Sequence, residues 1–439
     1  MKRNSGQVYS ELYWKYPEEP AIGVYYLRKP QLLLRDLDLI KTAVVKEFTS
    51  FHDNIFSTGL ENDLFLSFNP FMAKGERWKT LRSLHTKALT TNKIKGMYPL
   101  MVDVCQEMKE YVNQNLGTPI EAKYFSGQYT ADSVACCVFG LKTNSFADPG
   151  AESTKLSKQL SKRESSLSVM IASLMPRIAS LLRIRFISKE VTDFFIKVVE
   201  DIYEYRKQNN VTRNDFLQTF LDDYITSETP KYTLEEIAAY TMTFFIDGYE
   251  TSSSLMAFTL YILGLYPKIQ ERVREEITEV SHIDYETIHD LKYLDAVINE
   301  TLRLYPPELL LTRQCTQDIL LKSGDRTYPV TKGMSIAIPI YSIFRDSQYY
   351  PEPTVFDPSR FYEKPLPPSF FPFGLGPRAC SGSTFALTQI KLALVYLLEN
   401  FKVIPRDADA AMPELNPRNT IVIVPPGGLW IKFENIISE

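Results

Sequence analysis

The sequence predicts a mainly α-helical protein with a small β-rich portion, and three observations support this fold class. Across residues 70–280, apolar residues recur at intervals of three and four, the spacing that places them on one face of a helix. Residues 234–265 are largely apolar and follow Thr233, which forms a T-x-x-E capping box with Glu236. Short runs with strand composition lie near both ends of the chain.

Three helices can be delimited by their end signals. The longest, over residues 234–265, has roughly thirty residues and spans roughly 45 to 50 Å at about 1.5 Å per residue. We therefore expect it to cross the protein and to be buried along much of its length. A second helix is predicted over residues 291–304 with Asp290 as its N-cap, and a third over residues 384–398.

Strands are predicted in five short apolar runs, at residues 22–26, 32–34, 335–340, 420–424 and 429–433. The last two flank a P-P-G-G stretch and are expected to form a hairpin. Segments 1–60 and 415–435 therefore contribute to small sheets, whereas 70–310 is mainly helical. Residues 346–382 are expected to be irregular because prolines are dense there, and long irregular segments inside compact proteins are usually functional.

The composition excludes several classes of protein. With 44% hydrophobic and 23% charged residues, the chain can bury a substantial core. A formal net charge of -4 provides no global attraction to nucleic acid, so a nucleic-acid partner is not expected. No run of eighteen apolar residues appears, and the amino end lacks the apolar core of a signal peptide, so no membrane span is expected in the chain as written.

The five cysteines match neither a disulfide framework nor a zinc site, because their number is odd and their spacing is unpaired: Cys105, Cys136, Cys137, Cys315 and Cys380. Cys380 differs from the rest by its surroundings. It precedes a predicted helix, whose first amides and positive end stabilise a thiolate, as does Arg378. Gly376 and Gly382 let the backbone approach a flat ligand. Without such neighbours, a small buried apolar role is the commoner explanation for a cysteine.

The stretch around this cysteine resembles the haem-ligand signature F-x-x-G-x-R-x-C-x-G of the cytochrome P-450 family, and the matching residues are Phe373, Gly376, Arg378, Cys380 and Gly382. The resemblance implies that the Cys380 thiolate is the axial ligand of haem b iron and favours O–O cleavage. It implies that Arg378 pairs with a haem propionate. It also implies the family's fold as a single domain over residues 1–439, with the long central helix over the haem and the cysteine-ligand loop beneath.

Two further arginines match family positions. Trp78 and Arg82 form a W-x-x-x-R pair, which places an indole N–H and a guanidinium one helical turn apart, suited to holding a carboxylate. The resemblance assigns that carboxylate to a haem propionate, and Arg313 in the L-T-R-Q-C stretch is similar to another propionate ligand. Taken alone, a surface arginine near a core tryptophan is commonplace.

Glu300 and Arg303 form the family's E-x-x-R pair on the second predicted helix. The P-S-R-F stretch at residues 358–361 resembles the family's P-E-R-F segment, with Ser359 in place of glutamate. The resemblance implies that Arg360 joins the pair in a buried triad, which pins the irregular chain leading to the cysteine. Most isolated E-x-x-R pairs are solvated salt bridges, which is the alternative.

The middle of the long helix interrupts its apolar pattern. Gly248, Glu250 and Thr251 resemble the family's A/G-G-x-E/D-T motif, and a glycine there costs a helix about 1 kcal/mol relative to alanine. The resemblance implies a helix distortion that makes room for dioxygen, with Glu250 connecting to solvent and Thr251 helping to deliver protons. The alternative is a threonine bonded back to its own helix and a glutamate on the surface.

Asp247 departs from the family pattern, which has Ala or Gly at that position. It precedes Thr251 by four residues, so it shares a helix face with Thr251 and Phe244 and is expected to look towards the haem. One hypothesis is that it pairs with a protonated amine of the substrate. The alternative is a protonated or water-bonded Asp without a role in selectivity. The expected substrate pocket comprises Phe244, Phe245, Asp247, Gly248, Leu309, Leu310 and Leu311.

The resemblance covers residues 13–433 and is closest to animal microsomal members, in particular insect detoxification enzymes. It implies a monooxygenase that inserts one oxygen atom from dioxygen into a small lipophilic substrate, such as a xenobiotic, plant toxin or endogenous lipid. NADPH electrons would come through a flavoprotein reductase. Two alternatives stay open: a reductase-independent hydroperoxide isomerase, which the Glu250 and Thr251 pair argues against, and a non-catalytic haem-bearing ligand-binding paralogue.

The resemblance also implies a monomer on the cytoplasmic face of the endoplasmic reticulum membrane. The chain as written lacks the family's N-terminal anchor, so it is expected to be truncated or differently placed. Residues 167–186 are apolar with basic punctuation, which predicts a peripheral membrane contact, with a core helix pair as the alternative. A basic cluster around Trp78 predicts a docking face for an acidic reductase, or else a solvated surface: Lys74, Arg77, Lys79 and Lys87.

Overall fold

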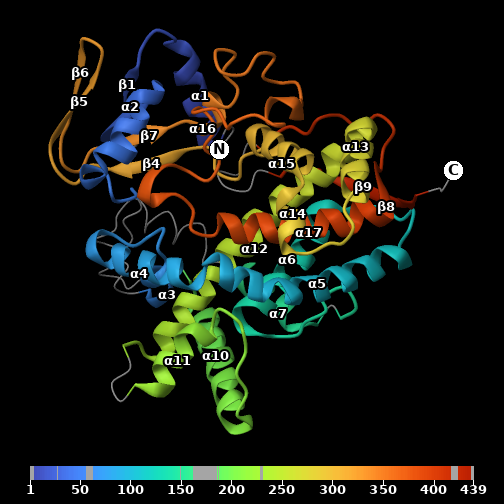
Figure 1. Ribbon diagram of the computed structural model, residues 1–439. Helices are drawn as coiled ribbons and strands as arrows, with labels where there is room; N and C mark the ends of the chain where they lie inside the picture. Colours follow the sequence, from blue (N-terminus) through green and yellow to red (C-terminus); the bar gives the residue numbers. More distant parts are fainter. Residues whose placement is uncertain are drawn as a thin grey trace.

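Helices make up the body of the molecule, and small sheets lie at its edges (Figure 1). The computed structural model describes residues 4–26, 28–55, 63–148, 150–161, 185, 187–227, 231–416 and 424–436. The predicted mainly α fold class with a small β-rich portion is confirmed. The predicted membrane-contacting segment, residues 167–186, lies outside the described residues except for Arg185. The prediction is therefore untested.

The long helix α12 runs from Leu234 to Leu265, as the sequence predicts. Thr233 Oγ1 accepts from the Glu236 amide at 3.2 Å, and the Glu236 carboxylate accepts from the Thr233 amide at 3.0 Å, which completes the capping box. Buried residues occur all round the helix, and it passes through the middle of the fold (Figure 1). The other elements are therefore arranged around α12.

Six of the described helices pack against α12, namely α3 (Leu64–Phe68), α6 (Ala122–Phe139), α10 (Lys189–Asn209), α13 (Pro267–Thr278), α15 (Lys292–Leu304) and α17 (Ser383–Asn400). The other helices are α1 (Ser5–Lys15), α2 (Leu37–Lys41), α4 (Gly75–Ala88), α5 (Thr91–Gln114), α7 (Glu152–Ser161), α11 (Gln218–Thr226), α14 (Tyr285–Asp290) and α16 (Ile340–Ile343). None of the described helices is long and apolar enough to cross a lipid bilayer.

Three sheets are present in the described part of the chain. The largest has the order β1-β2-β7-β4, from strands Ala21–Tyr26, Lys29–Leu34, Ser335–Ile338 and Leu311–Gln314. A second has the order β3-β9-β8, from Ile120–Glu121, Trp430–Asn435 and Phe401–Pro405. The third pairs β5 (Ile319–Ser323) with β6 (Arg326–Val330). Long-range pairing therefore ties both ends of the chain to its middle.

The predicted strands near the amino end form the expected antiparallel pair, whereas the strand predicted over 335–340 ends at Ile338 because α16 begins at Ile340. The predicted terminal hairpin is only partly described, since residues 417–423 lie outside the described residues. Strand β9 pairs with β8 and β3, which are distant in sequence. Its alternating buried positions, such as Phe433 opposite Val403, explain this pairing because they face the core.

The prediction that Asp290 caps the second helix is wrong. Asp290 is the last residue of α14, and α15 begins two residues later after Leu291, which makes no side-chain cap. The first amides of α15 are capped from another helix: the Glu276 carboxylate of α13 accepts from the Tyr293 amide at 2.7 Å and the Leu294 amide at 2.9 Å. A cap from a distant residue leaves no local sequence signal.

Residues 346–382 are irregular, as predicted, with only single 3₁₀ turns at Pro358–Arg360 and Gly376–Arg378. Helix α17 follows directly and extends two residues beyond the prediction, to Asn400. This arrangement places Cys380 between an irregular segment and the first turn of a buried helix.

Candidate active site

Cys380 is exposed, whereas the other four cysteines are buried. Its amide donates to the Phe373 carbonyl at 2.8 Å, which closes the loop before α17. Burial by surrounding protein raises the pKa of the Cys380 thiol, and the Gly382 amide and Arg82 lower it. A side chain that is enclosed by protein and still has accessible surface must face a cavity inside the molecule. The sulfur therefore lies in the interior and is available to a ligand.

Helix α4 packs against the cysteine loop through two polar contacts. Arg82 Nη1 donates to the Ala379 carbonyl at 2.7 Å, and His85 Nδ1 lies 3.0 Å from Ser381 Oγ. Burial, followed by the charge of Arg82, lowers the pKa of His85 to about 3, so this imidazole is neutral. The residues on both sides of Cys380 are thus held by α4.

Arg378 belongs to the cysteine loop, and its guanidinium lies over the Trp78 ring, 4.4 Å from the ring centre. It donates to three carbonyls, those of His52, Pro70 and Ala73, at 2.7 to 2.8 Å. Burial and the positive charges of Arg313 and Arg82 lower the pKa of Arg378 to about 9, although Asp53 opposes the change. The structure therefore brings Trp78, Arg378 and the two other predicted arginines into one region.

Gly376 is required by the path of the chain as well as by any ligand. Its φ of +71° lies in the left-handed region, and a Cβ there would lie 2.3 Å from the Val44 carbonyl oxygen. The close approach of the residues around Val44 thus fixes the loop that leads to Cys380.

Glu300, Arg303 and Arg360 come together as the motif resemblance implies. Arg303 forms two hydrogen bonds with the Glu300 carboxylate, at 2.7 and 2.8 Å, and both side chains are fully buried. Arg360 Nε approaches Glu300 Oε1 at 3.4 Å. Arg303 also donates to the carbonyls of Phe344, Pro353 and Val355, which belong to the chain entering or forming the irregular segment. The ion pair therefore anchors the segment that ends at Cys380.

The motif in the middle of α12 is held by hydrogen bonds to four consecutive carbonyls. Thr251 Oγ1 donates to the Asp247 carbonyl at 2.8 Å, which is the back-bonded geometry named as an alternative above. The carbonyls of the next three residues accept from Gln389 of α17, from Thr130 of α6, and from the two serines at 253 and 254. A Cβ on Gly248 would lie 3.3 Å from Val134, so the glycine also permits the close approach of α6.

Comparison with known proteins now identifies the family. The family model described as Cytochrome P450 matches residues 1–433. The chain belongs to the cytochrome P450 family. It is 32% identical to Cytochrome P450 6k1 of Blattella germanica, over 97% of this chain and 87% of that protein. It is 31% identical to Probable cytochrome P450 6a21 and 32% identical to Probable cytochrome P450 28a5, both of Drosophila melanogaster, in each case over 99% of this chain and 90% of the relative.

Family membership makes the protein a monooxygenase and implies haem, and the charges around Cys380 fit that cofactor. The buried Arg313 donates to Asn54 Oδ1 and the Thr312 carbonyl, at 2.9 and 2.8 Å. Arg82 and Arg313 act on Arg378 as like charges, while two carboxylates, Asp53 and Glu308, oppose these three arginines, so positive charge is in excess. Two propionates are suited to balance such a cluster.

Asp247 lies in the interior of this cytochrome P450, and its charge raises the pKa of the Cys380 thiol. Burial raises the pKa of Asp247 to about 7, and a hydrogen bond from the Asn69 side chain lowers it. The Asn69 oxygen already accepts from the Phe71 amide at 2.7 Å, which leaves its amide nitrogen for Asp247. No described cation pairs with Asp247, so the carboxylate is available to a positively charged ligand.

Glu308 is a second interior carboxylate, which sequence reasoning missed. Burial raises the pKa of Glu308 to about 7, although the charge of Arg313 lowers it. Glu308 in turn raises the pKa of the Cys380 thiol. A signal existed, because this single acid stands between two prolines and three leucines. An isolated charge in an apolar run is costly unless it has a partner or a function.

The other residues expected in the substrate pocket pack against different parts of the protein. Phe244 stacks on Phe216 with ring centres 4.4 Å apart and is nearly buried. Phe245 is fully buried near Phe139 and Phe195. Leu309 packs closely against the N-terminal helix, Leu310 against the small cluster under β2, and Leu311 lies near Gly374. A substrate contact of these five apolar residues stays a prediction.

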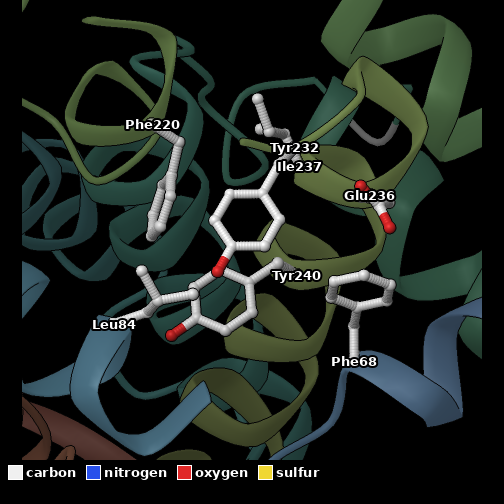
Figure 2. Close-up of a pocket in the computed structure, with 7 residues that line it drawn as sticks. All are labelled: Phe68, Leu84, Phe220, Tyr232, Glu236, Ile237 and Tyr240. Atoms are coloured by element: carbon white, nitrogen blue, oxygen red, sulfur yellow. The ribbon is translucent and has the colours of Figure 1, made fainter. Parts of the chain in front are cut away.

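A narrow apolar pocket lies beside the amino-terminal turns of α12. Seven residues from α3, α4, α11 and the start of α12 line it: Phe68, Leu84, Phe220, Tyr232, Glu236, Ile237 and Tyr240. Figure 2 shows four aromatic rings gathered around this space. Tyr240, Phe244 and Asp247 follow at helical spacing, so the pocket and the interior carboxylate share one face of α12.

The predicted basic cluster is only partly on the surface. Lys74 is half-buried and donates to Gln314 at 2.9 Å, whereas Arg77, Lys79 and Lys87 are exposed. Lys79 pairs with Glu76 of its own helix at 2.6 Å. The positive charges available to a partner protein are therefore mainly those of Arg77 and Lys87.

Replacing Arg303 by Leu is expected to destabilise the protein by about 3–5 kcal/mol, because it leaves Glu300 buried without a partner. The free energy of unfolding, measured by denaturant titration, checks this value. Lys79→Met breaks a pair exposed at 61% and 85% and serves as the control, with an expected cost below about 1 kcal/mol. Equal effects of the two substitutions would contradict an anchoring role for Arg303.

Proposed function

We propose that this monooxygenase binds haem b through Cys380 and oxidises a small lipophilic substrate, with NADPH electrons supplied by a flavoprotein reductase. The observation that carries the proposal is that Cys380, alone among the five cysteines, is accessible inside the protein. Three arginines with excess positive charge lie around it. Haem, when bound, supplies the oxygen-activating chemistry, and the protein supplies its ligand, charge balance and proton path.

Under this proposal, the Cys380 sulfur is the ligand of the iron, while Arg82, Arg313 and Arg378 hold the propionates together with Trp78. The Gly382 amide donates to the sulfur and keeps the thiolate at a lower pKa than burial alone would allow. Phe373 supplies the carbonyl that holds the Cys380 amide, and Gly376 shapes the loop.

Proton delivery is proposed for Thr251 and Glu250. Thr251 Oγ1, bonded to the Asp247 carbonyl, lies on the side of α12 that looks into the interior. The Glu250 side chain is 31% exposed and so reaches solvent. A carboxylate with access to water can take a proton from solvent and pass it to the hydroxyl side of the helix.

We propose that the protein acts as a monomer on the cytoplasmic face of the endoplasmic reticulum, with peripheral membrane contact, as its family resemblance implies. The proposed substrate is a xenobiotic, plant toxin or endogenous lipid, as the family resemblance implies. The alternatives, a hydroperoxide isomerase and a haem-bearing ligand-binding paralogue, both predict no product that depends on NADPH and a reductase.

Cys380→Ser is expected to abolish the thiolate-type absorption band of the reduced, carbon monoxide-bound protein, because serine cannot supply a thiolate. The absorption spectrum of the purified, haem-supplied protein measures this directly. Cys315→Ser is the matched control: the Cys315 Sγ donates to the Gln317 carbonyl at 2.9 Å, a bond that a hydroxyl can replace, so the band should persist. A band that survives in Cys380→Ser would remove the basis of the proposed function.

Product formation is expected to require both NADPH and a microsomal reductase. In the double variant Arg77→Glu/Lys87→Glu, the rate of product formation at low salt should fall by about tenfold or more, because docking of an acidic partner is steered electrostatically. The initial rate, measured against ionic strength, should converge with the unaltered protein as salt screens the charges. Lys197→Glu, an exposed charge reversal on α10, is the control. Equal rates in all three proteins would favour a plain solvated face.

Asp247→Ala is expected to weaken binding of a lipophilic amine by about ten- to hundredfold, the equivalent of about 1.5–3 kcal/mol, while its neutral isostere binds as before. The shift in haem absorption reports binding. Because the Asp247 pKa is raised to about 7, amine affinity should increase as pH rises through 7 and the carboxylate ionises. Asp247→Asn, which is neutral and of equal size, should lose this pH dependence. An equal effect on amine and isostere would discard the proposal.

A further inference from the structure

Lys123 occupies an electrostatically unfavourable position. It is the second residue of α6, and a positive charge at the amino end of a helix opposes the helix dipole. Its side chain is only 18% exposed, and burial lowers its pKa. A methionine or leucine at this position would avoid both penalties. The charge therefore calls for an explanation beyond packing.

The explanation lies in what the ammonium contacts on α12. Lys123 Nζ donates to Ser253 Oγ at 2.6 Å and lies 3.3 Å from Glu250 Oε1. Ser253 Oγ in turn donates to the Glu250 backbone carbonyl at 3.0 Å. One ammonium thus holds both the side chain and, through Ser253, the backbone of Glu250.

Few other charges act on this pair. Glu121, the N-cap of α6, attracts Lys123 but is engaged with the amides of Lys123 and Tyr124, at 3.2 and 2.7 Å. Among the described residues, Lys123 forms the ion pair with the Glu250 carboxylate. The Lys123–Glu250 contact is therefore the ion pair that the described residues give this glutamate.

We propose that Lys123 is a positioning residue for proton delivery: its ammonium holds the Glu250 carboxylate directed towards α6, ready to accept a proton from solvent. The proton then moves to the Thr251 side of the helix, and the carboxylate returns to its pair with Lys123. No electron transfer is involved, since one proton enters from water and one leaves. The inference rests on the proposed role of Glu250.

Position along the helix supports this role. Glu250 and Ser253 are three residues apart, so they present one face of α12 to α6, while Thr251 points away from it. Thr130 of α6 also donates to the Tyr249 carbonyl, at 3.1 Å. Helix α6 therefore holds the motif on one side through polar contacts, and the ion pair is the part of that contact that can respond to a proton.

The test compares Lys123→Met, Lys123→Arg and Glu250→Gln in the haem-loaded protein. An infrared carboxyl band that is present in the unaltered protein and absent in Glu250→Gln reports the protonation of residue 250. In Lys123→Met its midpoint pH should move upward, because the ammonium that lies 3.3 Å from the carboxylate has been removed. Lys123→Arg should restore the midpoint. The pH profile of kcat should move in the same direction while KM is unchanged.

Lys391→Met is the matched control. Lys391 is also a buried lysine that joins two helices, with Nζ 2.6 Å from Asp295 of α15, and its replacement should lower stability without moving the infrared midpoint or the kcat profile. An unmoved midpoint in Lys123→Met would overturn the inference and leave the role of Glu250 intact. If Glu250→Gln itself leaves kcat and its pH profile unchanged, the proposed relay fails and the inference with it.

Discussion

The buried pair of Glu300 and Arg303 is the interaction on which the arrangement of the site depends. Residues 346–382 form local backbone turns but no helix or strand beyond single 3₁₀ turns, so side chains must fix how these turns are placed against the rest of the protein. Arg303 binds three carbonyls at the start of this path, and Glu300 accepts from the Asp357 amide at 2.9 Å. Removing one partner would leave an unpaired charge in the core, which makes the anchor all-or-none. The position of Cys380 follows from that anchor.

Charge is distributed unevenly around Cys380. The arginines beside the cysteine loop exceed the nearby carboxylates of Asp53 and Glu308, whereas Asp247 is an acid without a described cationic partner in the same interior. The first imbalance suits an anionic cofactor and the second suits a cationic ligand.

Helix α12 connects these features to solvent. It carries Asp247 and Thr251 towards the interior and Glu250 towards α6, so neighbouring residues on one helix reach different environments. Polar side chains of α6 and α17 hold the carbonyls between them. The rigidity of the motif is thus supplied by neighbouring helices, which also explains why a glycine is tolerated in the middle of a buried helix.

The sequence by itself determined the fold class, the limits of α12 and the irregular segment that precedes α17, because capping boxes, apolar periodicity and proline density are local signals. It also determined which residues form the Glu300, Arg303 and Arg360 cluster, through resemblance of motifs. Only the tertiary structure decided that Glu276 caps α15, that β9 pairs with β8, that Lys123 pairs with Glu250, and that Glu308 lies within reach of the Arg313 charge. Each of these depends on a partner far away in the chain, and the physical chemistry of a side chain is set by the partner that folding brings to it.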